Sequence, residues 1–336
     1  MSATLPAPPG TQTPDRARRD AIVGVINSPI GSIAITLLVI VVIGVSWIGH
    51  SFLTGSNLNI VTTNIAVPLL LATFSAFALL AGVVDLSIGS NAGLSASIFA
   101  YLVLHHWNPW AAALVVAGAG ILIGVVNAAV VVGLGAPPIA ATLGMLSTLA
   151  GLQIVLNGTN NSLTVLVPSL YHFANRDLGP IPLVVILLIV LVIVAVYVVT
   201  MTRLGRHIRA VGGDERAATR AGISVPRIRV GSLLLSGLGG AVAGILYIGQ
   251  LGGTTNTLGS DLVFLVYAGV MIGGYSIIRG GVGNPAGGAL GLLVIAGVTD
   301  IIAVKSINTY YTDVIVGVLL LLAVYFDRIR GGDSYE

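Results

Sequence analysis

The chain contains no cysteine among its 336 residues, so disulfides, thiolate chemistry and cysteine-ligated metal sites are excluded. Charged residues are also scarce: they make up 8% of the sequence, whereas a soluble domain carries about a quarter. A G-x-x-x-x-G-K-[ST] phosphate loop is missing, because the glycine pairs at 273–274 and 280–281 lack the lysine. We therefore expect no ATP hydrolysis by this chain itself, and no nucleophile–base pair or zinc-ligand spacing indicates a membrane enzyme.

Hydrophobicity is what the chain has in excess. Hydrophobic residues make up 56% of it and the mean hydropathy is +1.01, which a single membrane anchor cannot produce. Each membrane helix needs roughly 20 apolar residues. The 44 glycines would indicate loops in a soluble protein, but membrane helices tolerate glycine and use it to approach one another closely. The sequence therefore predicts an all-α polytopic membrane protein.

Ten apolar segments recur along the chain and are the predicted membrane spans. A broken-helix region is expected near 82–90, where Gly82, Asp85, Gly89 and Ser90 interrupt the apolar pattern. Residues 1–28 are predicted to form a disordered tail, 29–328 the transmembrane domain, and 329–336 a second tail. The predicted spans are 30–49, 60–81, 88–104, 110–133, 138–157, 181–201, 230–250, 263–278, 285–303 and 311–327.

The basic residues orient these spans. If both tails are cytoplasmic and the ten spans alternate, 13 of the 15 basic residues fall inside, and only Arg176 and Lys305 fall outside, as the positive-inside rule requires. Six spans then precede the basic segment 203–229 and four follow it. The one sizeable outer loop is expected at roughly 158–180.

The segment 203–229 carries seven of those basic residues and is predicted to be a cytoplasmic loop with one short helix. Asp214 is a suitable N-cap for this helix, Glu215 favours its first turn, and Gly222 is placed to end it. A helix of about two turns is marginal alone in water, so it requires a surface to dock on. That surface is either its own membrane domain with the lipid headgroups, or another cytoplasmic protein.

Three stretches resemble one protein family. Residues 202–223, TRLGRHIRAVGGDERAATRAGI, closely resemble the cytoplasmic loop of ribose/xylose/galactose-type ABC permeases, with Asp214 where that family usually has Asn. AGVVDLSIGS at 81–90 is similar to the family's G-G-I-D-L-S-V-G-S, with Val83 in place of the second glycine. MIGGYSIIRGGVG at 271–283 resembles V-I-G-G-T-S-x-x-G-G-x-G with one extra residue, and milder similarity covers 50–327. The family's acidic E-L-D stretch before the third motif is not reproduced in register, which weakens any transfer of substrate identity.

The resemblance implies the transmembrane permease subunit of a binding-protein-dependent ABC importer in the bacterial plasma (inner) membrane. Its solute would be a monosaccharide or a similar small polyhydroxylated compound. The implied partners are an ATP-binding subunit that uses ATP and Mg, an extracytoplasmic solute-binding protein, a second permease copy (identical or homologous) and membrane lipid. Nucleic acid, metal and cofactors bound by this chain are not expected. The loop residues expected to couple to the ATPase are Arg206, Gly212, Gly213, Asp214, Glu215, Ala217, Ala218 and Gly222.

Polar and aromatic residues inside the spans are candidates for the translocation pathway. A carboxylate in the membrane is costly, so Asp85 either caps and braces the helix break or contacts substrate. Interhelical hydrogen bonds explain most neutral polar residues, Asn127 and Ser236 among them. Asp300 is expected to be solvated or paired at the surface near Lys305. The pathway candidates are Asp85, Ser87, Phe74, Asn64, Gln153, Asn157, Gln250 and Tyr267.

Two other function classes stay open on the sequence alone. A secondary transporter coupled to an ion gradient would work without an ATPase and would use an ion-coupled charge such as Asp85. A passive channel would conduct a small polar solute with no partner at all. Recovery of an ATPase subunit with the purified chain discriminates both from the importer.

Overall fold

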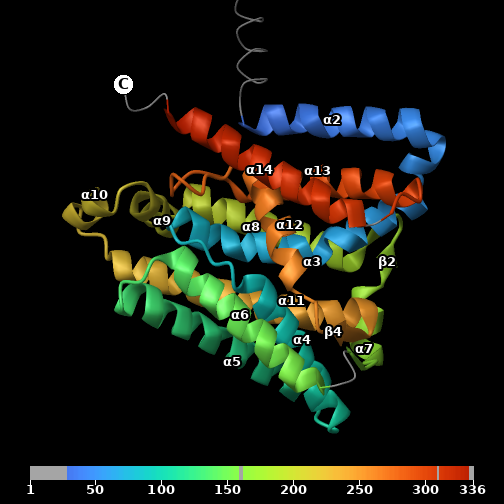
Figure 1. Cartoon of the computed structure of the whole chain (residues 1–336), viewed down its shortest axis with the longest axis horizontal. Helices are drawn as coiled ribbons and strands as arrows, with labels where there is room; N and C mark the ends of the chain where they lie inside the picture. The colour runs from blue at the N-terminus through green and yellow to red at the C-terminus, as the bar shows by residue number, and fades with distance from the viewer. Residues whose placement is uncertain (1–28, 159–161, 309, 333–336) are drawn as a thin grey trace, which may run out of the picture.

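The computed structural model describes residues 29–158, 162–308 and 310–332, most of which are helical (Figure 1). The predicted N-terminal tail, 1–28, lies outside the described residues. Two short non-α helical turns are present, a 3₁₀ helix η1 (Gly49–Leu53) and a π-helical turn η2 (Ala129–Gly133). The α-helices are α2 (Pro29–Ile48), α3 (Gly55–Leu80), α4 (Ile88–Leu104), α5 (Pro109–Ala128), α6 (Pro138–Asn157), α7 (Pro168–Ala174), α8 (Leu183–Met201), α9 (Arg203–Gly213), α10 (Glu215–Arg220), α11 (Val225–Leu251), α12 (Ser260–Ile272), α13 (Pro285–Val304) and α14 (Tyr310–Gly332).

Seven of the described helices are long and apolar enough to cross a membrane. They are α2 with η1, α3, α5 with η2, α6, α8, α11 and α13. Three shorter apolar helices, α4, α12 and the apolar part of α14, accompany them. The chain is therefore a helical, multi-pass membrane protein, as the composition predicted.

The two ends of the helical bundle carry different helices and strands. In Figure 1, α9 and α10 lie at the left-hand end, where α14 also finishes, whereas α7 and β2 lie at the right-hand end. Two short antiparallel pairs are formed, β1 (Ser162–Thr164) with β4 (Gly253–Thr255) and β2 (Asp177–Leu178) with β3 (Ile181–Pro182). The described part of the segment expected as an outer loop, 158–180, thus contains β1, α7 and β2.

Helix α11 is the central packing element, and it contacts α3, α4 and α5 through small residues. A Cβ added at Gly124 would lie 2.6 Å from the Leu233 carbonyl oxygen, and one at Gly237 would lie 3.0 Å from the Gly124 amide nitrogen. In lipid, helix association depends on this kind of close contact rather than on hydrophobic exclusion. The glycine content of the sequence is therefore used in helix packing.

The predicted break near 82–90 is confirmed. Helix α3 ends at Leu80, α4 begins at Ile88, and the segment between them is non-helical and largely buried, with Gly82 exposed. Gly82 has φ of +74°, a conformation that glycine adopts without steric cost. Gly82 therefore allows the backbone conformation in which α3 ends.

Two predicted boundaries were wrong. The span expected at 263–278 is helical only to Ile272, because Gly273 packs against the backbone of Gly287 and Gly274 turns with φ of +87°. The expected loop 203–229 instead contains α9, α10 and the start of α11, since α9 is capped by Thr202, whose hydroxyl accepts from the Gly205 amide. Helix α14 continues to Gly332, so the first residues of the predicted tail 329–336 belong to that helix.

Candidate functional site

Helix α10 projects from one end of the bundle, and most of its surface is exposed. As predicted, Asp214 caps it: the carboxylate accepts from the Ala217 amide at 2.9 Å. Gly222 follows its end with φ of +79°. Glu215 also pairs with Arg229 of α11 at 2.9 Å, which ties the start of α10 to the bundle. The short helix is thereby held in place without its outer face being covered.

The Asp214 carboxyl is set for the charged state. The Ala217 amide, together with the Arg216 amide and the Arg220 and Arg216 side chains, holds the pKa of this carboxyl below its usual range. A carboxylate at a helix N-terminus also interacts favourably with the helix dipole. The cap is therefore fully ionised at neutral pH.

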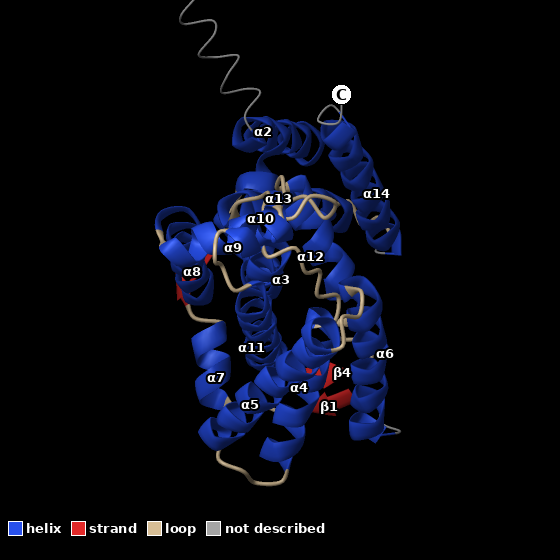
Figure 2. Ribbon diagram, turned by 90° about the vertical axis from the view of Figure 1, so that its left-hand side faces the viewer, coloured by secondary structure: helices blue, strands red, loops and turns tan. Residues whose placement is uncertain are grey.

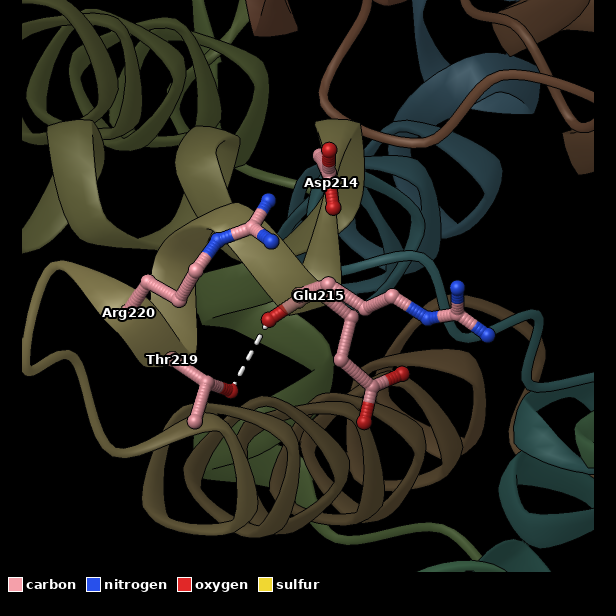
Figure 3. A pocket seen from close by; sticks show the side chains of 5 residues that line it. Asp214, Glu215, Thr219 and Arg220 are labelled. Atoms are coloured by element: carbon pink, nitrogen blue, oxygen red, sulfur yellow. Dashed lines mark hydrogen bonds between the residues drawn. The ribbon is translucent and has the colours of Figure 1, made fainter.

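The faces of α10 differ. Ala217 is exposed, whereas Ala218 is buried at 3% exposure in a cluster with Val211 and Val225. Ala218, predicted as a coupling residue alongside Ala217, therefore anchors α10 to α9 and α11 instead of facing outward. Beside the exposed face lies an open hollow of about 680 Å³ (Figure 3), which is lined by Asp214, Glu215, Arg216, Thr219 and Arg220.

The C-terminal end of α9 meets both glycine-rich breaks of the chain. A Cβ at Gly212 would overlap the Leu80 carbonyl oxygen and lie 2.5 Å from the Gly281 amide nitrogen. A Cβ at Gly280 would lie 2.9 Å from the Gly82 Cα and 2.9 Å from the Gly212 carbonyl carbon. We call these four residues, Gly82, Gly212, Gly280 and Gly281, the glycine junction. It joins the segment after α3, the segment after α12 and the helix that precedes α10.

Arg209 strengthens this junction. Its guanidinium donates to the carbonyl oxygens of Gly281 at 3.3 Å and Gly283 at 2.8 Å. Arg209 is not among the predicted coupling residues, since one arginine in a basic segment carries no distinguishing local signal. By contrast, Arg206 and Gly213, both predicted coupling residues, are exposed and lie outside the junction.

Asp85 lies at the centre of a buried hydrogen-bond network. Its Oδ1 accepts from the Ser87 amide at 3.0 Å and from the Ser87 hydroxyl at 2.6 Å, and its Oδ2 accepts from the Ser236 hydroxyl at 2.6 Å. Asn127 donates to the Ser87 hydroxyl at 2.8 Å. The network thus joins the break to α5 and α11, the interhelical role predicted for Asn127 and Ser236.

Tyr267 of α12 completes this network through the backbone. Its hydroxyl accepts from the Asp85 amide at 3.0 Å and donates to the Asp85 carbonyl oxygen at 2.9 Å. Asp85, Ser87 and Tyr267, three predicted pathway residues, are therefore brought together. All three are buried at 2% exposure or less, and the contacts of the Asp85 carboxylate are those of a brace across the helix break.

The other predicted pathway residues are spread over three places. Gln153 donates to the Thr255 carbonyl oxygen at 2.6 Å and Asn157 to the Asn256 side chain at 2.8 Å, so they fasten α6 to the last residue of β4 and to the residue that follows it. Gln250 donates to the Thr63 carbonyl oxygen, next to Asn64. Phe74 packs against Gly239 in the interior, where a Cβ would lie 2.5 Å from the ring carbon Cγ.

Asn64 lines a cavity of about 240 Å³ between α3, α12, α13 and α14. Asp300 lines the same cavity, is buried at 7% exposure and accepts from the Asn57 amide group at 2.8 Å. The expectation that Asp300 is solvated or paired at the surface was wrong, because Asn57 covers it. Lys305 instead lies over the Trp47 ring, 5.8 Å from its centroid.

Fold and site together define a polytopic membrane protein with a short, exposed helix, α10, joined to breaks in its membrane helices. Residues 57–324 match a family profile described as the permease component of a branched-chain amino acid transport system. The chain belongs to this family of transport-system permease components.

The similar proteins in this family include sugar permeases, which agrees with the resemblance found in the sequence. The ribose import permease protein RbsC of Escherichia coli K12 is 31% identical, with 88% of this chain and 92% of RbsC covered. The D-allose transport system permease protein AlsC of the same organism is 29% identical, with 87% and 90% covered. The autoinducer 2 import system permease protein LsrC of an Enterobacter species is 28% identical, with 83% and 81% covered. No solved structure matches the chain.

Proposed function

We propose that this chain is the membrane subunit of an ATP-driven importer and moves a monosaccharide, or a similar small polyhydroxylated solute, into the bacterial cytoplasm. The chain crosses the plasma membrane ten times, three of them by the shorter helices α4, α12 and α14. Both chain ends and α10 lie on the cytoplasmic side. The positive-inside distribution of the basic residues supports this orientation.

The observation that carries the proposal is the exposed, capped helix α10. An isolated helix of six residues is unstable, yet here a cap, an ion pair and the buried Ala218 hold it in place. Because α10 is held in place while its outer face stays exposed, that face is suited to binding a partner protein. We assign the exposed face around Ala217 to a separate ATPase subunit, which binds ATP and Mg and supplies the energy this chain lacks.

The glycine junction is the route by which α10 acts on the membrane helices. Where two backbones touch with no side chain between them, a displacement of one moves the other, because no side chain can absorb the displacement by changing its rotamer. Motion of α10 reaches α9 directly, and Gly212 and Arg209 then pass it to the segments that follow α3 and α12. Those segments continue into α4 and α13. A shift at the glycine junction therefore moves these two helices and opens or closes the pathway.

The pathway runs along the face that carries α6. Although α6 is apolar overall, it exposes Gly144, Ser147, Thr148 and Gly151 on one side. The Thr148 hydroxyl donates to the Gly144 carbonyl oxygen at 2.9 Å, and the small residues on this side allow another helix to approach closely, so the side suits a second copy and a polar passage. Figure 2 has α6 and α14 along the same right-hand side of the bundle. We propose that this side pairs with a second permease, identical or homologous.

At the opposite end from α10, the ordered outer segments form the surface for a solute-binding protein. The β1–β4 pair, α7 and the β2–β3 pair all lie there (Figure 1). The names of the ribose and D-allose relatives support a sugar as the solute. The specificity of selection then belongs largely to the binding protein.

A cysteine-based experiment tests the docking assignment directly. Because the chain has no native cysteine, Thr219→Cys provides a single site on the exposed face of α10. We expect a thiol crosslinker to join it to the co-expressed ATPase subunit, and a membrane-impermeant thiol reagent to label it only from the cytoplasmic side. Trp110→Cys is the matched control, which should be labelled only from outside. Labelling of both positions from the same side would overturn the orientation, and an absence of ATPase capture would overturn the docking.

A further inference from the structure

A groove between α5, α9 and α11 is the feature of the molecule that the proposed transport does not use. It has a volume of about 400 Å³. In both views α11 lies between α9 and α5, so it forms the floor of the groove (Figure 1, Figure 2). The walls include Ile121 of α5 and Leu204 of α9, whose side chains are 39% and 48% exposed.

The inside of the groove offers nothing to a polar solute. Leu234, Leu235 and Leu238 line its floor. The hydroxyl of Ser232 donates a hydrogen bond to the Ile228 carbonyl oxygen at 2.8 Å, so it is not available to a ligand. No acidic residue lines it. An acyl chain is the ligand that matches such a surface, because every contact it makes is apolar.

One end of the groove is cationic. Arg227 lies in its lining and is exposed, and Arg203, also exposed, directly precedes the lining residue Leu204 on α9. Among the described residues, the one ion pair is Arg229 with Glu215, so Arg227 and Arg203 have no acidic partner there. Unpaired cations at a membrane surface attract anionic headgroups.

The dimensions fit one lipid leaflet. From Arg227 to Leu238 is eleven residues of α11, or about 16 Å at roughly 1.5 Å per residue. Half of a hydrocarbon core of about 30 Å is about 15 Å. The charged end and the apolar length thus follow the shape of a phospholipid that stands upright in one leaflet. In the proposed orientation the groove continues into the hydrocarbon region, where a lipid reaches it and a cytoplasmic ATPase subunit does not.

We propose that this groove binds an anionic phospholipid, with an acyl chain along α11 and the phosphate at Arg227. The proposed orientation makes this the inner leaflet, and the site itself does not depend on transport. The bound lipid contacts α9, the helix that carries Gly212 of the glycine junction. The lipid composition of the membrane then affects the stability of α9 in its position against the bundle.

Native mass spectrometry of the purified chain, titrated with phosphatidylglycerol and with phosphatidylcholine of the same acyl chains, tests the site. We expect one phosphatidylglycerol per chain to bind preferentially. Arg227→Gln should weaken it about fivefold, the effect of one arginine near an anionic surface, and Arg227→Lys should restore it. Gly231→Phe should abolish it, because Gly231 lines the groove with open space at its Cβ position. Gly317→Phe, at a similarly open glycine of α14, is the control and should bind normally.

Equal binding of the two lipids, or selective binding unchanged in both Arg227→Gln and Gly231→Phe, would overturn the site. If Gly231→Phe instead left lipid binding intact and weakened capture of the ATPase subunit, the groove would be a protein contact and the inference would fail. Because Arg227 is exposed, Arg227→Gln changes no buried packing. If the Gly231→Phe variant misfolds, lipid binding by Arg227→Gln still tests the site. The measurement needs neither ATP nor solute, so its failure is distinct from failure of the transport proposal.

Discussion

Arg209 donates a 2.8 Å hydrogen bond to the carbonyl oxygen of Gly283, 74 residues further along the chain. The bond joins the helix that leads into α10 to the segment that leads into α13. A second bond from the same guanidinium reaches Gly281 at 3.3 Å. Helix α9, which leads into α10, is therefore bonded directly to the membrane bundle, and under the proposed function these bonds transmit the motion of the ATPase subunit.

Replacing Arg209 should uncouple the importer without dismantling it. Arg209→Gln removes two charge-assisted bonds to backbone, each contributing about 1.5–3 kcal/mol when the donor is charged. We expect ATPase capture to persist and the solute moved per ATP hydrolysed to fall several-fold in proteoliposomes. Arg206→Gln, on the exposed side of the same helix, is the control and should retain coupling. An equal loss in both variants would mean that charge at this surface, and not the bond to Gly283, is what matters.

Adjacent glycines provide a sharper contrast. A Cβ at Gly212 meets the backbone of two other segments, whereas a Cβ at Gly213 meets nothing within 4 Å. Gly212→Ala should therefore lower stability by about 1–3 kcal/mol, the usual cost of overpacking, and reduce transport. Gly213→Ala should be near wild type in both. Thermal unfolding in detergent and uptake assays check the pair, and similar behaviour of the two variants would contradict the junction.

Variants of Asp85 separate bracing from charge transport. Asp85→Ala leaves the Ser87 amide, the Ser87 hydroxyl and the Ser236 hydroxyl without their acceptor, at about 1–3 kcal/mol for each group that stays buried and unpaired. In Asp85→Asn the amide oxygen still accepts from Ser87, and the Ser236 hydroxyl can turn to accept from the amide nitrogen. We expect Asn to keep both fold and transport and Ala to lose both. A stable Asn variant with no transport would favour an ion-coupled carrier.

The Asp214 cap predicts a pH dependence with a definite sign. Because the folded-state pKa is lowered, the cap stabilises α10 at any pH above the ordinary aspartate value of about 4, and this is lost as pH falls through the lower folded value. Hydrogen exchange at the amides of 217–221, corrected for intrinsic rates, should show constant protection from pH 7 to 5 and a decline below about 4. Asp214→Asn caps without titrating, so its profile should stay flat; matching profiles would refute the assignment.

Local signals in the sequence anticipated part of this structure. The break at 82–90, the Asp214 cap and the stop at Gly222 all follow from residues that act on their own backbone, so no tertiary information was needed. Helix α9 was missed although its signal was present. Gly205, Ile208 and Val211 recur every third residue and are the buried side of the helix, but the surrounding arginines gave the segment the composition of a loop.

Other features depend on contacts between distant segments. The glycine junction unites residues from three parts of the chain, and nothing near Gly212 announces Gly82 or Gly280. Asp300 is buried because Asn57, 243 residues earlier, covers it. The eight candidate pathway residues were chosen for polarity or aromatic character alone. That criterion found the buried network around Asp85, but it also chose residues that fasten loops, such as Gln153.

Uptake by proteoliposomes tests the central claim most directly. The purified chain is reconstituted with its ATPase subunit and binding protein, and labelled ribose or D-allose is added with ATP, with a non-hydrolysable ATP analogue, or with an imposed ion gradient alone. We predict accumulation only with ATP, and its loss in Ala217→Glu, which places a charge on the exposed face of α10 without disturbing the buried Ala218. Accumulation driven by the ion gradient without ATP, or unchanged in Ala217→Glu, would contradict the account.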